Sequence, residues 1–145
     1  MSSKALVGAL LLACSGCPTS GQSDCGTDSD CSSPDVCGRD HACTDPSNVR
    51  EVTVTWTVRG GEASAASCGS QPDFTITFFA SDIGDELGFT PVPCANGQFF
   101  VDQLPKRFRT VEIGLGGRRV PINADGTAMG DFTPQSPRAA LRNAT

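Results

Sequence analysis

The sequence predicts an all-β protein, a small antiparallel β-sandwich preceded by a short disulfide-rich module. Valine and tryptophan alternate with threonine over residues 52–59, which is the period-two pattern of a strand with one buried face. Sixteen glycines and ten prolines provide the frequent turns of an all-β chain. Four cysteines recur at even spacing before the strands, in a stretch too polar to form a core of its own.

The N-terminal stretch has the layout of a secretory signal. Lys4 precedes an apolar run over residues 5–13, and small residues and two cysteines follow at once. The run is too short for a membrane span, which needs about 20 apolar residues. A cysteine placed directly after such a run resembles the lipobox of bacterial lipoproteins, which implies a lipidated N-terminal cysteine. We therefore expect a signal peptide over residues 1–16 and a lipid anchor at Cys17, with Cys14 as the alternative.

The number of cysteines favours Cys17 as the anchor. The chain has 8 Cys, and cleavage before Cys17 removes one and lipidates another, which leaves an even number for disulfides. Cleavage before Cys14 would leave Cys17 as an odd thiol in an oxidising compartment. A secreted protein without a lipid is the other interpretation. The anchor implies a location in the bacterial cell envelope, and we expect the outer membrane.

Two short segments follow the expected signal. Residues 17–24 are small and polar, which favours a flexible tether. Residues 25–46 form the cysteine-rich module, in which five residues separate each pair of successive cysteines: Cys25, Cys31, Cys37 and Cys43. Zinc ligands usually come in pairs two to four residues apart, so we expect disulfides and no metal. Four cysteines allow three connectivities, and the sequence does not choose between them.

The module resembles the cysteine-rich segments of the Dickkopf N-terminal type, which recur in bacterial exported lipoproteins and often have Asp before the second cysteine, as Asp30 stands here. Asp28 and Asp30 suggest calcium, but the loop lacks the glycine and distant glutamate of an EF-hand. We interpret them as turn residues in contact with solvent. His41 is the only histidine, and we expect it to be an exposed loop side chain.

Residues 47–133 are predicted to form the β-sandwich domain, and residues 134–145 a disordered tail. Pro91 and Pro93 lack a donor for a strand ladder, so their strand should lie at a sheet edge. Asn96-Gly97 predicts a type I′ hairpin between the third and fourth strands. The expected core includes Trp56, Phe74, Ile76, Val111 and Ile113, with Leu115 on the same face. The seven strands are expected at residues 52–59, 74–78, 89–94, 99–104, 109–115, 118–123 and 128–133.

The run from Asn96-Gly97 through Leu104-Pro105 to Val111 resembles carboxypeptidase-regulatory or transthyretin-like β-sandwiches, which carry D-G-x-F followed by L-P-x-G-x-Y-x-V. Arg107 and Arg109 stand where that pattern has glycine and tyrosine. The resemblance implies an accessory, adhesive or spacer domain without catalytic residues. Cys68 and Cys94 are expected to form a third disulfide, which should contribute about 3 kcal/mol to stability.

Charge and motifs favour a non-enzymatic function. A net charge of −5 gives no attraction for nucleic acid, and we find no catalytic motif and expect no cofactor. Five basic residues are either a solvated rim or a docking patch for an anionic partner: Lys106, Arg107, Arg109, Arg118 and Arg119. We expect an envelope lipoprotein that acts as an interaction or structural module near the membrane, with an envelope protein or glycan as its partner. The alternative is a β-sandwich protein that binds a small ligand or a glycan.

Overall fold

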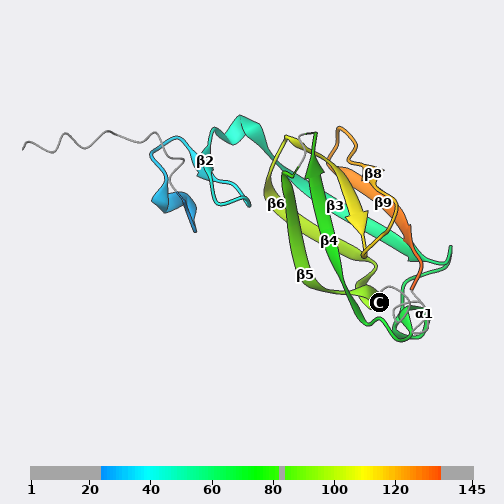
Figure 1. Ribbon diagram of the computed structural model, residues 1–145. Helices are drawn as coiled ribbons and strands as arrows, with labels where there is room; N and C mark the ends of the chain where they lie inside the picture. Colours follow the sequence, from blue (N-terminus) through cyan, green and yellow to red (C-terminus); the bar gives the residue numbers. More distant parts are fainter. Residues whose placement is uncertain (1–23, 82–83, 135–145) are drawn as a thin grey trace, which may run out of the picture.

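The computed structural model describes residues 24–81 and 84–134, which form a two-layered β-sandwich with a small module at one end (Figure 1). The predicted signal peptide, the lipidation at Cys17 or Cys14, nearly all of the tether and nearly all of the tail lie outside the described residues. Within the described part, no helix is long and apolar enough to cross a membrane.

The cysteine-rich module consists of a short 3₁₀ helix and one small hairpin. Helix η1 (Asp28–Asp30) precedes strands β1 (Val36–Cys37) and β2 (Cys43–Thr44), which pair antiparallel. A second 3₁₀ helix, η2 (Pro46–Asn48), leads directly into the first sandwich strand. Its first residue is a proline, and the Asp45 side chain accepts a hydrogen bond from the Ser47 N–H, so the start of this helix is defined by sequence.

The sandwich contains a three-stranded and a four-stranded sheet. The first has the order β6 (Gln98–Pro105), β3 (Val49–Val58), β9 (Thr127–Phe132). The second has the order β5 (Glu86–Pro93), β4 (Asp73–Ala80), β7 (Phe108–Ile113), β8 (Val120–Pro121). A short helix, α1 (Ala65–Cys68), and the 3₁₀ helix η3 (Cys94–Asn96) lie at the end opposite the module (Figure 1).

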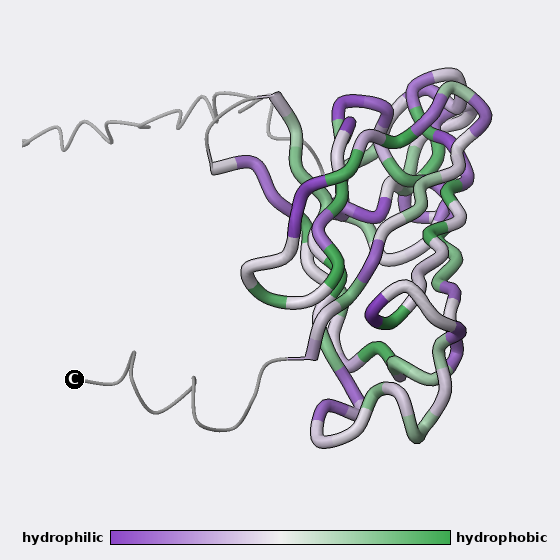
Figure 2. The backbone as a smooth tube through the Cα atoms, turned by 90° about the vertical axis from the view of Figure 1, so that its right-hand side faces the viewer, coloured by the Kyte–Doolittle hydropathy of each residue, from purple (hydrophilic) through white to green (hydrophobic). Residues whose placement is uncertain are grey.

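The inner faces of the two sheets form one hydrophobic core. Apolar and polar residues alternate along the strands (Figure 2), and the alternate positions of β3, from Val52 to Val58, are buried. Of the residues predicted for the core face, five are buried and only Leu115 is not, in agreement with the all-β prediction. The five are Trp56, Phe74, Ile76, Val111 and Ile113. The core cluster lies entirely in the sandwich and includes no residue of the cysteine-rich module.

Two expectations about topology are wrong. Strand β9 pairs with β3 in parallel, so the sandwich is mixed rather than wholly antiparallel. Asn96-Gly97 does not form a hairpin, because β5 and β6 belong to different sheets. Asn96 instead ends η3, and Gly97 adopts the left-handed conformation that carries the chain from one sheet to the other.

The predicted strands differ from the observed ones mainly after β7. Leu115 is 76% exposed rather than in the core, because β7 ends at Ile113 and Gly114 turns the chain out of the sheet with φ = 75°. Strand β8 has only two residues and pairs with β7. Strand β5, with its two prolines, lies at the edge of its sheet, as predicted.

Candidate functional site

The cysteine-rich module lies against the open edge of β6, and an irregularity in that strand makes the contact. Between Val101 and Leu104, β6 has one residue more than the paired stretch of β3, so the strand bulges. Gln103 in this bulge has φ = 47°, which is uncommon for a residue with a side chain. Its carbonyl accepts a hydrogen bond from the Arg39 N–H at 3.1 Å, so the bulge directs the backbone of the sandwich towards the module.

Side chains strengthen this junction. The Gln103 amide donates to both carboxylate oxygens of Asp28, at 3.2 and 3.1 Å. Asp28 also accepts from the Cys37 N–H at 2.9 Å, which fixes its orientation. The Arg39 guanidinium forms an ion pair with Asp102, with Nε donating to Oδ1 at 2.7 Å. The module and the sandwich are therefore joined by polar contacts around one pair of strand residues, Asp102 and Gln103.

A cleft of about 430 Å³ lies between the module and the sandwich, and we call it the junction cleft. This volume falls within the range of small-molecule sites, roughly 300–1,000 Å³. Phe89 of β5 provides its one apolar ring, which lies 5.2 Å from the Phe99 ring. The polar groups come from both parts of the protein: Thr27, Asp28, Arg39 and His41 from the module, Asp102 and Gln103 from the sandwich.

His41 is held in the junction cleft by its backbone and by its ring. It follows a turn closed by the His41 N–H and the Gly38 carbonyl, and its φ of 62° is the left-handed conformation of such a turn. Its Nδ1 lies 3.0 Å from the Cys25 carbonyl. A carbonyl oxygen only accepts, so Nδ1 carries a proton, and Nε2 of the neutral ring is left as an acceptor.

All six described cysteines form disulfides, as the sequence predicts. Cys25 bonds Cys37 and Cys31 bonds Cys43, with Cα–Cα distances of 5.8 and 5.6 Å that are usual for disulfides. This is one of the three connectivities that the sequence left open. Cys68 bonds Cys94, which joins α1 to η3.

The aspartates of the module act as turn and junction residues. Asp30 accepts from the Gly26 and Thr27 N–H groups, which lowers its pKa below the ordinary value. Asp40 is paired with Arg107 and Asp28 with Gln103. Among residues 24–81 and 84–134, only Cys25, Cys31 and Cys43 bring three metal-ligand atoms together, and these sulfurs are consumed by disulfides.

The five predicted patch residues are placed in different surroundings. Arg107 forms ion pairs with Asp85 at 2.6 Å and Asp40 at 2.7 Å, and the hydrogen bond to Asp85 raises its pKa. Arg119 lies over the Phe79 ring at 3.5 Å. Arg109 is close enough to Arg50 to add to the effect of burial, which lowers the pKa of Arg50.

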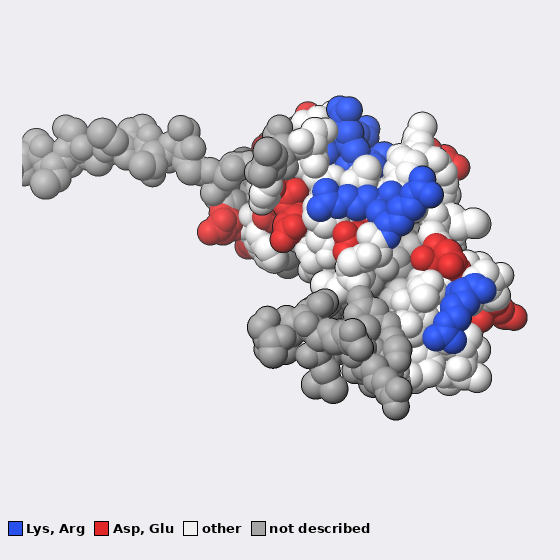
Figure 3. All heavy atoms as spheres, turned by 45° about the vertical axis from the view of Figure 1, so that its right-hand side comes forward, with Lys and Arg blue, Asp and Glu red and all other residues white. Residues whose placement is uncertain are grey.

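Lys106 and Arg118 are exposed. On the face seen in Figure 3, basic and acidic side chains lie next to one another. The basic side chains gather in a band on this face, and acidic side chains border it.

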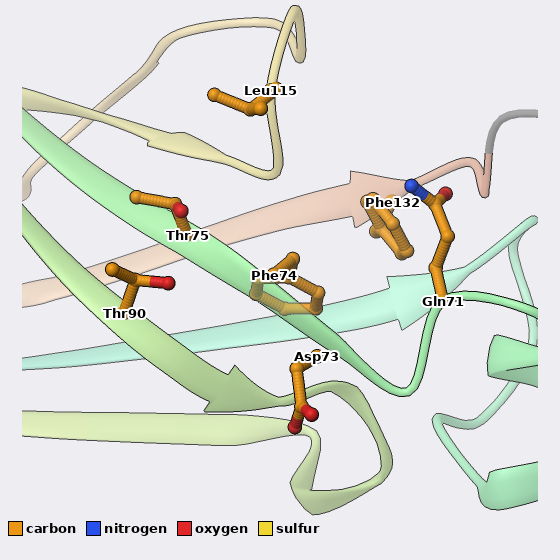
Figure 4. Close-up of a pocket in the computed structure, with 7 residues that line it drawn as sticks. All are labelled: Gln71, Asp73, Phe74, Thr75, Thr90, Leu115 and Phe132. Atoms are coloured by element: carbon orange, nitrogen blue, oxygen red, sulfur yellow. The ribbon is translucent and has the colours of Figure 1, made fainter. Parts of the chain in front are cut away.

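A second hollow lies at the far end of the sandwich (Figure 4). The rings of Phe74 and Phe132 form its floor with centroids 4.8 Å apart, and the side chain of Leu115 lies above them. Gly114 allows this packing, because a Cβ atom there would lie 2.5 Å from the Phe132 ring. At about 270 Å³ the hollow is smaller than most small-molecule sites, so the junction cleft is the stronger candidate.

Sequence reasoning missed Asp102 and Gln103, because both lie in an ordinary strand pattern and nothing nearby marks a bulge.

In comparisons with known proteins, no protein-family model, curated protein or solved structure matches the chain.

Proposed function

We propose that this protein is a non-enzymatic lipoprotein of the bacterial cell envelope, anchored at the outer membrane through Cys17 and acting as an interaction or structural module. One observation carries the proposal: all six described cysteines are paired in disulfides of normal geometry. Disulfides persist in oxidising compartments, which agrees with the signal-like N-terminal sequence.

The arrangement of reactive groups favours interaction over catalysis. No described cysteine is available as a nucleophile, because each one is bonded. The chain has a single histidine, and its Nδ1 is used by a backbone carbonyl rather than by a carboxylate that would form a dyad with it. Most of the charged residues at the junction pair with one another, which is the pattern of a structural contact.

The two resemblances belong to the same proposal. A hairpin whose two strands are each bonded by a disulfide to the preceding segment supports a module of the Dickkopf N-terminal type. A sandwich of two small sheets supports an accessory domain of the carboxypeptidase-regulatory or transthyretin-like type. Both kinds of module imply an interaction or spacer role.

The anchor is tested by detergent phase partitioning of the protein expressed in a bacterial host. We expect the native protein in the detergent phase, because a diacylated N-terminal cysteine carries long acyl chains. Cys17→Ala should block processing or release the protein into the aqueous phase, and Cys14→Ala should leave partitioning unchanged. Native protein found wholly in the aqueous phase would refute the anchor, and an effect of Cys14→Ala alone would move it to Cys14.

A second candidate function, binding of a small ligand or glycan, is favoured by the junction cleft. The cleft is of suitable size and gathers polar groups from both parts of the protein.

A further inference from the structure

The junction cleft contains many hydrogen-bonding groups and little net charge. Asp28 and Asp102 are acidic, Arg39 is basic, and Thr27 and Gln103 are neutral. We propose that this cleft binds a neutral sugar ring, either free or within a glycan chain. The inference deepens the second candidate function and does not depend on the lipid anchor.

The charges in the cleft are of both signs and disfavour anions most, because two carboxylates stand against one guanidinium. An anion in the cleft would meet Asp28 and Asp102, whereas a cation would meet Arg39 as well as these carboxylates. These charged groups already neutralise one another in part, since Arg39 is paired with Asp102. A ligand that offers many hydroxyl groups and no charge can donate to the carboxylates and accept from the guanidinium without an unpaired charge.

Phe89 provides the apolar contact that a sugar ring requires. A pyranose has one face rich in C–H groups, and these pack on the electron-rich face of an aromatic ring. Phe89 is half-buried, lines the cleft and packs against the Phe78 and Phe99 rings, at centroid distances of 5.8 and 5.2 Å. The cleft therefore combines one rigid aromatic ring with polar groups around it.

His41 supplies an acceptor of fixed orientation. Because Nδ1 donates to the Cys25 carbonyl, Nε2 of the neutral imidazole has no partner among the described residues and can accept from a sugar hydroxyl. The Cys25–Cys37 disulfide and the Arg39 contacts to β6 hold the hairpin that carries His41. A site that is already ordered loses little entropy when a ligand binds.

Backbone geometry offers a clean test variant. Three described residues other than glycine have a positive φ, and two of them, His41 and Gln103, line the cleft. His41→Gly removes the imidazole and fits the φ of 62° at least as well as histidine does, so the fold should be preserved. The third residue, Arg59, has φ = 51° in a turn of the sandwich outside the cleft, so Arg59→Gly is the matched control.

The experiment titrates sugars into the full-length protein, purified without reductant in a detergent that has no sugar headgroup, and follows backbone amide shifts by NMR. The neutral probes are glucose, galactose, mannose and N-acetylglucosamine. Maltotriose represents a glycan chain, and glucose 6-phosphate represents an anion. We expect millimolar binding of at least one neutral probe, with shifts at Gly26, Gly38, Phe89 and Gln103. Tighter binding of maltotriose than of glucose would indicate a glycan chain as the source.

His41→Gly should weaken binding by about three- to tenfold, the effect of one lost hydrogen bond, and Arg59→Gly should leave it unchanged. The inference is wrong if no neutral probe shifts the cleft amides, if only glucose 6-phosphate binds, or if the shifts fall elsewhere. Equal binding by the native protein and His41→Gly would also overturn it. None of these outcomes bears on membrane attachment, which the Cys17→Ala experiment tests by itself.

Discussion

Single residues determine how the two parts of this protein meet. Gln103 occupies a backbone conformation that glycine would adopt at lower cost, of the order of 1 kcal/mol. Its side chain compensates, because the amide donates to Asp28 and the bulge exposes the carbonyl that accepts from Arg39. His41 is similar, since its ring bonds the Cys25 carbonyl. At both positions the positive φ favours glycine, and the hydrogen bonds of the side chain compensate for that preference.

Asp131 of β9 accepts hydrogen bonds from β3 and from the turn that follows β3. These bonds predict that the stability of the fold depends on pH. Thr57 Oγ1 donates to it at 2.6 Å and the Gly60 N–H at 2.7 Å, which lowers its pKa. A depressed pKa stabilises the fold above the ordinary value near 4, and this stabilisation is lost as pH falls through the folded-state pKa. Hydrogen bonds lower the pKa of Asp30, Asp45 and Asp125 in the same direction.

We expect Asp131→Asn to lower the melting temperature at pH 7 and to match the native protein at low pH, where both side chains are neutral. Thermal melts followed by circular dichroism between neutral pH and pH 2 test this. Glu62→Gln is the control, because the exposed Glu62 carboxylate has no hydrogen bond or ion pair among the described residues. An Asp131→Asn profile parallel to the native one would show that these hydrogen bonds do not couple stability to pH.

At the scale of elements, the Cys68–Cys94 disulfide closes the end of the sandwich far from the module. It joins α1 to η3, and the Trp56 indole N–H donates to the Cys94 carbonyl at 2.9 Å. Both cysteines belong to the core cluster. The disulfide therefore ties the connection between β5 and β6 to the connection between β3 and β4, and the Trp56 hydrogen bond ties it to the central strand β3.

Replacing Cys68 and Cys94 together with alanine should cost about 2–4 kcal/mol, because a 26-residue loop is released in the unfolded chain and two buried side chains are truncated. Urea unfolding followed by Trp56 fluorescence measures the loss. The control is the Cys25→Ala/Cys37→Ala pair, which lies outside the core cluster and should shift the Trp56 transition much less. Equal losses in the two variants would contradict this assignment of stability.

How much of each element the sequence predicts depends on the kind of signal. Alternation of apolar and polar residues predicts β3 and β4 correctly, because a half-buried strand has an apolar residue at every second position. Alternation says which face is buried but not which strand lies alongside, so the parallel partner β9 was missed. The hairpin predicted at Asn96-Gly97 is wrong, because glycine in the left-handed backbone conformation also commonly ends a helix. Likewise the alternation of Val111 and Ile113 runs on to Leu115, although Gly114 ends the strand.

For the whole molecule, the module is attached to the sandwich by polar contacts rather than by a shared core. The side chains of the Arg39–Asp102 ion pair are both nearly half-exposed, and such pairs contribute about 0–1 kcal/mol to the free energy of unfolding.

The sequence predicts the cysteines of the site but not the cleft, because Asp102 and Gln103 lie more than sixty residues along the chain from the groups that they contact.

A protein of residues 47–133 should fold by itself, because every member of the core cluster lies within it. We expect it to melt no more than about 8 °C below the full mature chain, since only surface contacts are removed. Thermal unfolding followed by Trp56 fluorescence compares the two. If the shorter chain fails to fold, or melts far lower, the two parts form one structural unit and the domain boundary at residue 47 is wrong.

The parallel pairing of β3 with β9 also determines the order in which the protein can fold. Thr53 pairs with Thr127, so the strand in the middle of its sheet gains its second neighbour only when almost the last described residues are present. Until then, β3 presents an unpaired edge rich in valine and threonine, the kind of strand that recruits other chains. Contacts of such long range also slow folding. The chain should therefore complete its fold late and as a whole, and a protein shortened before Thr127 should aggregate rather than accumulate as a smaller native domain.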